Sequence, residues 1–235
     1  GAALHDMPDW LWPVWQDSLG AQANQAALTL QTRADVFLRV NLKRGTVTAA
    51  QEELANVGIV TQPHATVPAC LRVTENARRV KTAAAYLDGL VELQDAASQQ
   101  AVNAVPLPTG ARILDYCAGG GGKALAFADR VTQTVFAHDI APQRMRDLPE
   151  RAKRAGVEVV PLATQDLSDQ APFDVVFCDA PCSGSGTWRR APDAKWRLTA
   201  ATLAEAMQSQ AEVLRAAAEH VKSGGLLVYA TCSVL

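Results

Sequence analysis

From about residue 105 onward, short apolar stretches alternate with helical ones, a pattern typical of a parallel sheet wound by helices. Five stretches are nearly all apolar, as strands buried on both faces should be, and we expect strands at 112–117, 134–140, 157–162, 173–180 and 225–232. In such a sheet, ligands bind beyond the carboxyl ends of the strands. The first candidates for a site are therefore the residues at those ends, namely Asp115, Asp139, Asp179 and Cys232.

Helices are expected between these strands, and a smaller unit is expected before them. The helical stretch 142–156 begins with proline and ends at glycine, but its internal Pro149 should kink or shorten it. Another long helix is predicted at 199–221. The first hundred residues have a tryptophan-rich lead-in and a different pattern, with apolar or helical stretches at 36–41, 48–58, 69–73 and 90–95. We therefore predict three parts: a helical lead-in (1–30), a small α/β subdomain (31–92) and the sheet domain (93–235).

Composition limits the class of protein. A chain of 235 residues, 49% of them hydrophobic, can bury one sizeable core and a small second unit. Five cysteines without paired secretory spacing, and no long uncharged apolar run, predict free thiols in a reducing cytoplasm and no membrane. A formal net charge of −2 restricts any nucleic-acid contact to a local patch. The sequence has no metal-ligand spacing, so we expect no metal, and the four scattered histidines are expected to be structural.

Four consecutive glycines join the first strand of the sheet to its helix, in the stretch DYCAGGGGKA at 115–124. With no Cβ in the way, their backbone N–H groups can approach a ligand. Gly119, Gly121 and Ala124 match the G-x-G-x-x-A dinucleotide pattern, and a Walker P-loop fits worse. Asp139 can accept both hydroxyls of a ribose, which serves NAD and S-adenosylmethionine alike; a capping aspartate is the alternative. Asp166 can accept from an adenine amino group, or it merely turns the chain.

Two cysteines close apolar strands: Cys182 in CDAPCSGSGTW (178–188) and Cys232 in LLVYATCSVL (226–235). A dehydrogenase has no use for thiols there. A cytosine C5 methyltransferase requires one, because C5 is too weakly nucleophilic to take a methyl group until a thiolate adds to C6. An ordinary thiol with a pKa of about 8.5 is only about 3% thiolate at neutral pH, so the working cysteine needs local activation. Cys70, Cys117 and Cys178 are expected to be packing residues.

Three stretches, DYCAGGGGK, CDAPCSGSGTWRRAPDAKW and YATCSVL, resemble in order and spacing the Sun (Fmu) type of RNA 5-methylcytosine methyltransferase, specifically the bacterial small-subunit ribosomal RNA enzymes. The resemblance runs from the PDW stretch at 8–10 to the last residue. It implies a Rossmann-like S-adenosylmethionine-dependent methyltransferase sheet, with residues 31–92 as an RNA-recognition-motif-like α/β subdomain. It also implies S-adenosyl-L-methionine as cofactor and small-subunit ribosomal RNA as partner, and we expect a monomer.

The same resemblance implies residue roles. Cys232 would be the nucleophile, Cys182 would help to resolve the covalent intermediate, and Asp179 would lie where the methyl group meets the base. Asp139 would bind the ribose and Asp166 the adenine. The methionine end of the cofactor would be held by the glycine loop, that is by Cys117, Ala118, Gly119, Gly120, Gly121, Gly122 and Lys123. Independently of the resemblance, Arg144 is close enough to Asp139 in the sequence to border the cofactor.

Beyond the second of these stretches, Arg189, Arg190 and Lys195 lie in WRRAPDAKWR (188–197) and can grip RNA phosphates, unless this is an ordinary solvated loop.

The sequence also departs from the family pattern. The family's commonest loop reads alanine-proline, two glycines and lysine-threonine, whereas Gly119, Gly120 and Ala124 replace the alanine, proline and threonine here. Family members carry a helical RNA-binding domain before PDW and further strands after TCSVL, so we expect this chain to be part of a longer protein with its C-terminal strands missing. Two alternatives stay open: an NAD-dependent oxidoreductase and a non-catalytic RNA- or cofactor-binding module.

Overall fold

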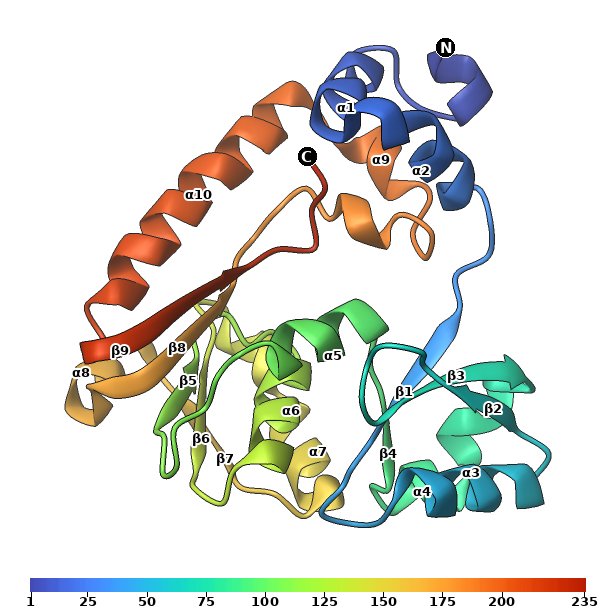
Figure 1. The fold of residues 1–235 in the computed structure, drawn as a ribbon. Helices are drawn as coiled ribbons and strands as arrows, with labels where there is room; N and C mark the ends of the chain where they lie inside the picture. Colours follow the sequence, from blue (N-terminus) through green and yellow to red (C-terminus); the bar gives the residue numbers. More distant parts are fainter. The chain divides into compact units, whose positions relative to one another are not determined.

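The computed structural model describes residues 1–235 (Figure 1). Its contacts divide the chain into two compact units, which we describe separately. Unit 1 comprises residues 1–34, 179–216 and 229–235, and unit 2 comprises residues 35–178 and 217–228. None of the helices is both long enough and apolar enough to cross a lipid bilayer.

The predicted parallel sheet forms in unit 2. Its strands are β5 (Ile113–Asp115), β6 (Val135–His138), β7 (Val159–Leu162), β8 (Phe173–Asp179) and β9 (Val221–Ala230), in the order β7-β6-β5-β8-β9. β5, β6 and β7 pair in parallel, and β8 pairs in parallel with β5. This order is that of a doubly wound Rossmann-like sheet, which confirms the predicted fold class. β9 begins four residues before the predicted 225, because the preceding helix α10 (Ala200–Ala218) ends three residues earlier than predicted.

Helices α6 (Gly122–Arg130) and α7 (Leu148–Ala155) follow β5 and β6. The predicted interruption by Pro149 is confirmed: a 3-10 turn η4 (Pro142–Met145) comes first, and α7 begins only at Leu148. Pro149 lies in the first turn of α7, where its missing N–H costs no hydrogen bond. Short turns η5 (Thr164–Asp166) and α8 (Leu167–Gln170) connect β7 to β8. In the core, Phe127 of α6 meets Phe177 of β8 edge to face, with 5.2 Å between ring centroids.

Unit 2 also contains a four-stranded antiparallel sheet. Its strands are β1 (Val36–Val40), β2 (Val60–Pro63), β3 (Cys70–Glu75) and β4 (Val91–Leu93), in the order β2-β3-β1-β4. Helix α3 (Val47–Asn56) connects β1 to β2, and η3 (Ala77–Thr82) with α4 (Ala84–Leu87) connects β3 to β4. This is the β-α-β-β-α-β arrangement of ferredoxin-like folds, as predicted for the small subdomain. Strand β2 was not predicted, because it has only four residues, VTQP, which are largely exposed and show no apolar run.

Strand β1 has two buried faces, which follows from its alternating side chains. Leu38 and Val40 belong to the core formed with α3. Phe37 points to the other face, where it packs against Cys70 and against Ala96 of helix α5 (Ala96–Asn103). Burial raises the pKa of the Cys70 thiol to about 11, in keeping with the predicted packing role.

Unit 1 is organised around aromatic side chains. Helices α1 (Leu11–Leu19) and α2 (Ala23–Leu30) pack with the loop after β8, which includes η6 (Ser185–Thr187) and α9 (Ala194–Arg197). Trp15 and Trp188 are both buried, and their rings stack with centroids 5.9 Å apart. The indole Nε1–H of Trp15 donates to the Ala23 carbonyl at 2.9 Å. These contacts hold the lead-in against the segment that carries PCSG.

Candidate active site

The glycine loop joins β5 to α6 in a conformation that only glycine adopts easily. Gly119 and Gly121 have φ values of 53° and 79°. A Cβ on Gly121 would also lie 2.3 Å from Cδ1 of Leu148. The turn is closed by the Gly121 N–H, which donates to the Ala118 carbonyl at 2.8 Å. The glycines at 119 and 121 therefore meet a backbone requirement of this turn, which lies at the carboxyl end of β5.

Asp139 follows β6 directly and faces this loop. Its side chain is nearly buried, with the residue 3% exposed. Oδ2 accepts from the Gly119 N–H at 2.8 Å and from Nη1 of Arg144 at 3.0 Å, while Oδ1 accepts from the Ala141 N–H at 3.0 Å. The bond to Ala141 is the local turn of the capping alternative, but the bond to Gly119 reaches across to the loop. Asp139 thus caps its local turn and also holds the glycine loop, while its contact with a ribose stays a prediction.

The carboxylate retains capacity for a ligand. Each carboxylate oxygen can accept two hydrogen bonds, so Oδ1, with one donor, has a position left for a hydroxyl. Oδ2 has two donors, one of which is Arg144. The Arg144 side chain is 59% exposed, so it can turn into solvent and free a second position. Arg144 therefore contacts Asp139, and its predicted place at the border of the cofactor stays a prediction.

Other predicted residues of this region lie at the same edge of the sheet. β6 and β7 pair so that His138 is level with Leu162, and Asp166 is an exposed residue in the turn η5 beyond β7. His138 is buried and connects the segments that follow β5 and β7. Its Nδ1 lies 2.8 Å from the Tyr116 carbonyl oxygen, and its Nε2 lies 3.0 Å from Thr164 Oγ1. Burial lowers its pKa, so the ring is neutral at physiological pH, and its role is structural, as expected.

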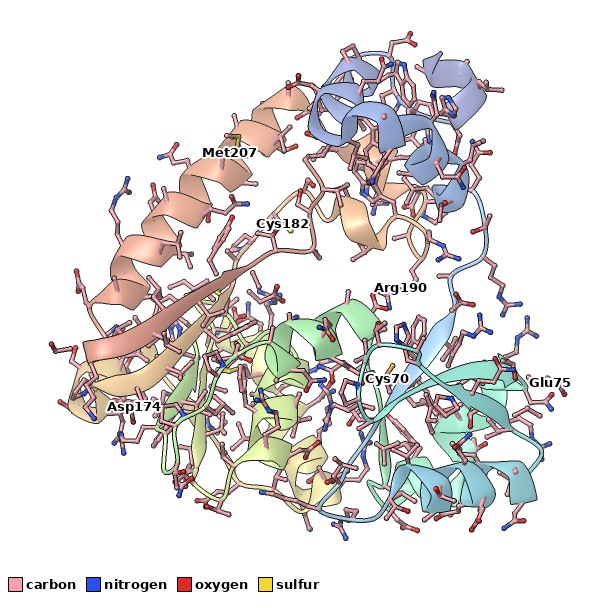
Figure 2. All side chains as sticks on the ribbon, in the orientation of Figure 1. Cys70, Glu75, Asp174, Cys182, Arg190 and Met207 are labelled. Carbon is pink, nitrogen blue, oxygen red and sulfur yellow. The ribbon has the colours of Figure 1, made fainter.

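In unit 1, the two predicted cysteines meet. Sγ of Cys182 lies 3.3 Å from Sγ of Cys232, and Figure 2 shows Cys182 on the loop that follows β8. The Gly186 N–H donates to the Cys232 carbonyl at 2.8 Å, and a Cβ on Gly186 would lie 2.8 Å from the same oxygen. Ser183 Oγ is 2.7 Å from Ser233 Oγ. The glycines and serines of PCSGSG thus hold it beside TCS and bring the two thiols together.

The proximity of the thiols changes their acidity. The hydrogen bond from Cys232, with a further backbone bond at Gly184, lowers the pKa of Cys182 to about 6, against burial and the charge of Asp179. The pKa of Cys232 is raised, chiefly because its proton is held by Cys182 and also because of burial. The two groups titrate as a pair that carries one negative charge and one shared proton at neutral pH. The lowered pKa therefore activates Cys182, whereas Cys232, the nucleophile that the resemblance implies, keeps its proton in the resting pair.

We expect alkylation by iodoacetamide to detect this pair. The thiolate is the reactive form, so the rate at Cys182 should rise to half its maximum near pH 6. In Cys232→Ala the donor is lost, and the profile should move to an ordinary thiol pKa of about 8.5. Buried Cys178, whose pKa burial raises to about 12, is the internal control and should stay unmodified in folded protein. Peptide mass spectrometry over a pH series measures the alkylation of Cys182 and Cys178 in the wild type and in Cys232→Ala. Identical pH profiles of Cys182 in the two proteins would contradict a shared proton.

In the basic loop 188–197, the structure contradicts the predicted contact between Lys195 and RNA phosphates. Lys195 is only 1% exposed, and its Nζ forms an ion pair with Asp6 Oδ2 at 2.6 Å, so it is a structural residue rather than a phosphate contact. Arg189 is half-buried and donates from Nη2 to the Arg33 carbonyl at 2.6 Å. Arg190 is exposed and labelled in Figure 2 on the same loop. No group of acidic, histidine and cysteine side chains is arranged to hold a metal ion.

A Rossmann-like sheet with a glycine loop after its first strand, an aspartate after its second and a ferredoxin-like companion sheet defines a class of methyltransferase fold. Residues 103–235 match the family described as 16S rRNA methyltransferase RsmB/F, and residues 7–81 match the ferredoxin-like domain of the RsmF/B-like methyltransferases. The chain belongs to the RsmB/F family of 16S rRNA methyltransferases.

Individual relatives agree with this assignment. The chain is 34% identical to ribosomal RNA small subunit methyltransferase B of Citrobacter koseri, over 97% of this chain and 54% of the relative. It is also 34% identical to the protein of that name from Vibrio cholerae, over 99% of this chain and 55% of the relative. The chain thus spans about half the length of the curated relatives it matches.

Solved structures share the fold. The crystal structure of PH0851 is 30% identical, with a TM-score of 0.90 over 98% of this chain and 54% of that one. NSun6 from Pyrococcus horikoshii, solved with SFG, is 17% identical, with a TM-score of 0.84 over 98% of this chain and 84% of that one. At that identity, the second likeness concerns the fold alone.

Proposed function

We propose that this chain transfers a methyl group from S-adenosylmethionine to C5 of a cytidine in small-subunit ribosomal RNA, through a covalent bond between Cys232 and C6 of the base. The observation that carries this proposal is the pair of thiols held 3.3 Å apart, because cytosine C5 chemistry is the methyl transfer that requires a thiolate. Membership of a methyltransferase family argues against the alternative of an NAD-dependent oxidoreductase.

The family is S-adenosylmethionine-dependent, and the residues of unit 2 fit that cofactor. The four glycines of the loop carry no Cβ, so the loop backbone can approach a ligand closely, and Asp139 keeps acceptor positions for ribose hydroxyls. When bound, the cofactor supplies an electrophilic methyl group. We assign its methionine end to residues 117–123, its ribose to Asp139 with Arg144 at the border, and its adenine to Asp166. Asp179, the last residue of β8, is assigned to the meeting point of methyl group and base.

The thiol pair suggests how the nucleophile forms. In the resting pair the charge lies on Cys182 and the proton on Cys232, so Cys232 becomes nucleophilic when its proton passes to Cys182 across the 3.3 Å between the sulfurs. The Cys232 thiolate then adds to C6, and the C5–C6 π electrons become available at C5 to form the new carbon–carbon bond.

The reverse transfer serves release. The C5 proton leaves to solvent, its electron pair restores the C5–C6 double bond, and the Cys232–C6 bond breaks. The departing sulfur takes back the proton that Cys182 holds. Cys182 therefore acts first as base and then as acid, and it returns to its starting state.

RNA phosphates are the proposed partners of Arg189 and Arg190. Replacing both by glutamine should flatten the log–log salt dependence of RNA binding by about one to two units, because each phosphate contact releases roughly one counterion. Lys222→Gln is the control: this exposed lysine pairs with Asp174 near the amino ends of β8 and β9, away from the edge where ligands bind. Filter binding across a salt series measures the slope. An unchanged slope in the folded double variant would assign both arginines to structure.

We further propose a monomer that acts on ribosomal RNA in the cytoplasm, with residues 1–30 as lead-in, 31–92 as RNA-recognition-motif-like subdomain and 93–235 as methyltransferase domain. Bisulfite sequencing of small-subunit ribosomal RNA, from cells with and without the gene for the full-length protein, tests the function. One cytidine should lose its protection from deamination in the deletion strain and regain it on complementation. An identical protection pattern in both strains would count against this substrate.

A further inference from the structure

The second face of the ferredoxin-like sheet carries buried charges. Arg39 of β1 and Glu92 of β4 are partners across the antiparallel pair, so their side chains lie on the same face. That face is opposite to the one that packs on α3. Both residues are only 7% exposed, although buried charges are costly unless they are paired and hydrogen-bonded. Their partners therefore indicate what this face is for.

One branch of contacts runs from Arg39 to the start of α6. Arg39 forms a buried ion pair with Asp129 of α6, and its Nε donates to Gln94 Oε1 at 2.7 Å. The other end of the Gln94 amide, Nε2, donates to the Gly122 carbonyl at 3.0 Å. Both ends of this amide are thus used, and one of them holds the carbonyl of Gly122, which is the last of the four glycines and the first residue of α6.

A second branch runs from Glu92 to the same loop. Its carboxylate accepts from Arg154 Nη2 at 2.6 Å and lies 3.6 Å from Arg151 Nη2. Arg151 in turn donates from Nη1 to the Gly120 carbonyl. The turn before β4 approaches α7 closely here, because a Cβ on Gly89 would clash with the Arg154 carbonyl oxygen.

We propose that Gln94 and Glu92 are positioning residues for the cofactor loop, so that the ferredoxin-like sheet sets the loop's conformation in addition to any contact it makes with RNA. The inference rests on the proposed cofactor site. Four consecutive glycines have the largest backbone freedom to lose on ordering. Fastening the carbonyls of Gly120 and Gly122 removes much of that freedom before the cofactor arrives, which lowers the entropic cost of binding.

Gln94→Glu separates positioning from packing. The new side chain has the same shape and still accepts from Arg39, but it places a carboxylate oxygen instead of an N–H against the Gly122 carbonyl. The matched control is Gln62→Glu on β2, at the opposite edge of the same sheet, where Oε1 accepts from Arg72 Nη2 at 2.9 Å. Gln94→Met, which removes the donor without adding a charge, serves if the first variant does not fold.

Two readouts are made on each protein. Calorimetry with S-adenosylhomocysteine should show a dissociation constant raised about 3- to 10-fold in Gln94→Glu and unchanged in Gln62→Glu. In protein without cofactor, hydrogen exchange of the peptide containing residues 116–123 should be faster in Gln94→Glu than in the wild type. In Gln62→Glu it should equal that of the wild type. A purely structural role would lower the melting temperature but would leave both readouts as in the wild type.

The outcomes separate this inference from the proposed function. If the wild type binds S-adenosylhomocysteine and the folded Gln94 variant binds it equally well with unchanged loop exchange, the positioning role is wrong and the cofactor site stands. If the wild type does not bind it, the proposed cofactor site fails. Loop exchange still decides the positioning role in that case, because faster exchange in the Gln94 variant supports it and equal exchange overturns it.

Discussion

Replacing Cys182 with alanine is expected to leave the protein attached to methylated RNA, whereas Cys232→Ala should abolish both methylation and attachment. Without the Cys232 sulfur nothing adds to C6. Without Cys182 the addition still occurs, but the departing sulfur has no neighbour to return a proton, so the adduct persists as a band that survives denaturing electrophoresis. The experiment uses full-length protein, cofactor and a ribosomal RNA fragment.

The pH dependence of this trapping adds a sharper expectation. In Cys182→Ala the neighbour that raises the pKa of Cys232 is gone, so the pKa of Cys232 should fall to an ordinary value of about 8.5. Attachment should therefore be slow at neutral pH and should speed up as the pH rises through that value, because the thiolate is the attacking form. Cys178→Ala, which alters a buried thiol, is the control and should turn over without trapping. Trapping by Cys232→Ala instead would reverse the two roles.

Asp139→Ala should weaken binding of S-adenosylhomocysteine by about 1.5 to 3 kcal/mol, or roughly 10- to 150-fold. Two losses combine: the acceptor for ribose hydroxyls, and the bond that holds the Gly119 N–H. Asp139→Asn keeps the shape and one acceptor, so it should fall between wild type and alanine. Calorimetry measures this affinity, and a parallel titration with NADH tests whether the protein binds a nicotinamide cofactor instead. Unchanged affinity in a folded Asp139→Ala protein would remove this residue from the site.

The parts of the fold that follow from periodic apolar patterns could be predicted from the sequence. The five strands of the parallel sheet, the break at Pro149 and the meeting of PCSG with TCS were all expected, because each depends on local pattern or on the rule that parallel strands end at one edge. Strand β2 was missed because its four largely exposed residues show no apolar pattern, and its pairing with β3 depends on the backbone rather than on side chains.

Long-range polar pairing was not predictable. Lys195 looked like part of a basic RNA-binding loop, yet its partner Asp6 lies 189 positions away and draws it into the interior. The acidity of Cys182 depends on a sulfur 50 positions away. Arg39 and Glu92 did give a signal, since each interrupts an otherwise apolar strand, but only the register of β1 with β4 shows that they share a face.

Mass spectrometry of the covalent complex tests the central claim most directly. RNA carrying 5-fluorocytidine at the target position blocks the final elimination, because fluorine cannot leave C5 as a proton does, so the wild-type protein should be trapped with cofactor present. After nuclease and protease digestion, the modified nucleotide is expected on the peptide that contains Cys232, with Cys182 unmodified. A nucleotide on Cys182, or no adduct on either peptide while methylation of ordinary RNA proceeds, would contradict the proposed mechanism.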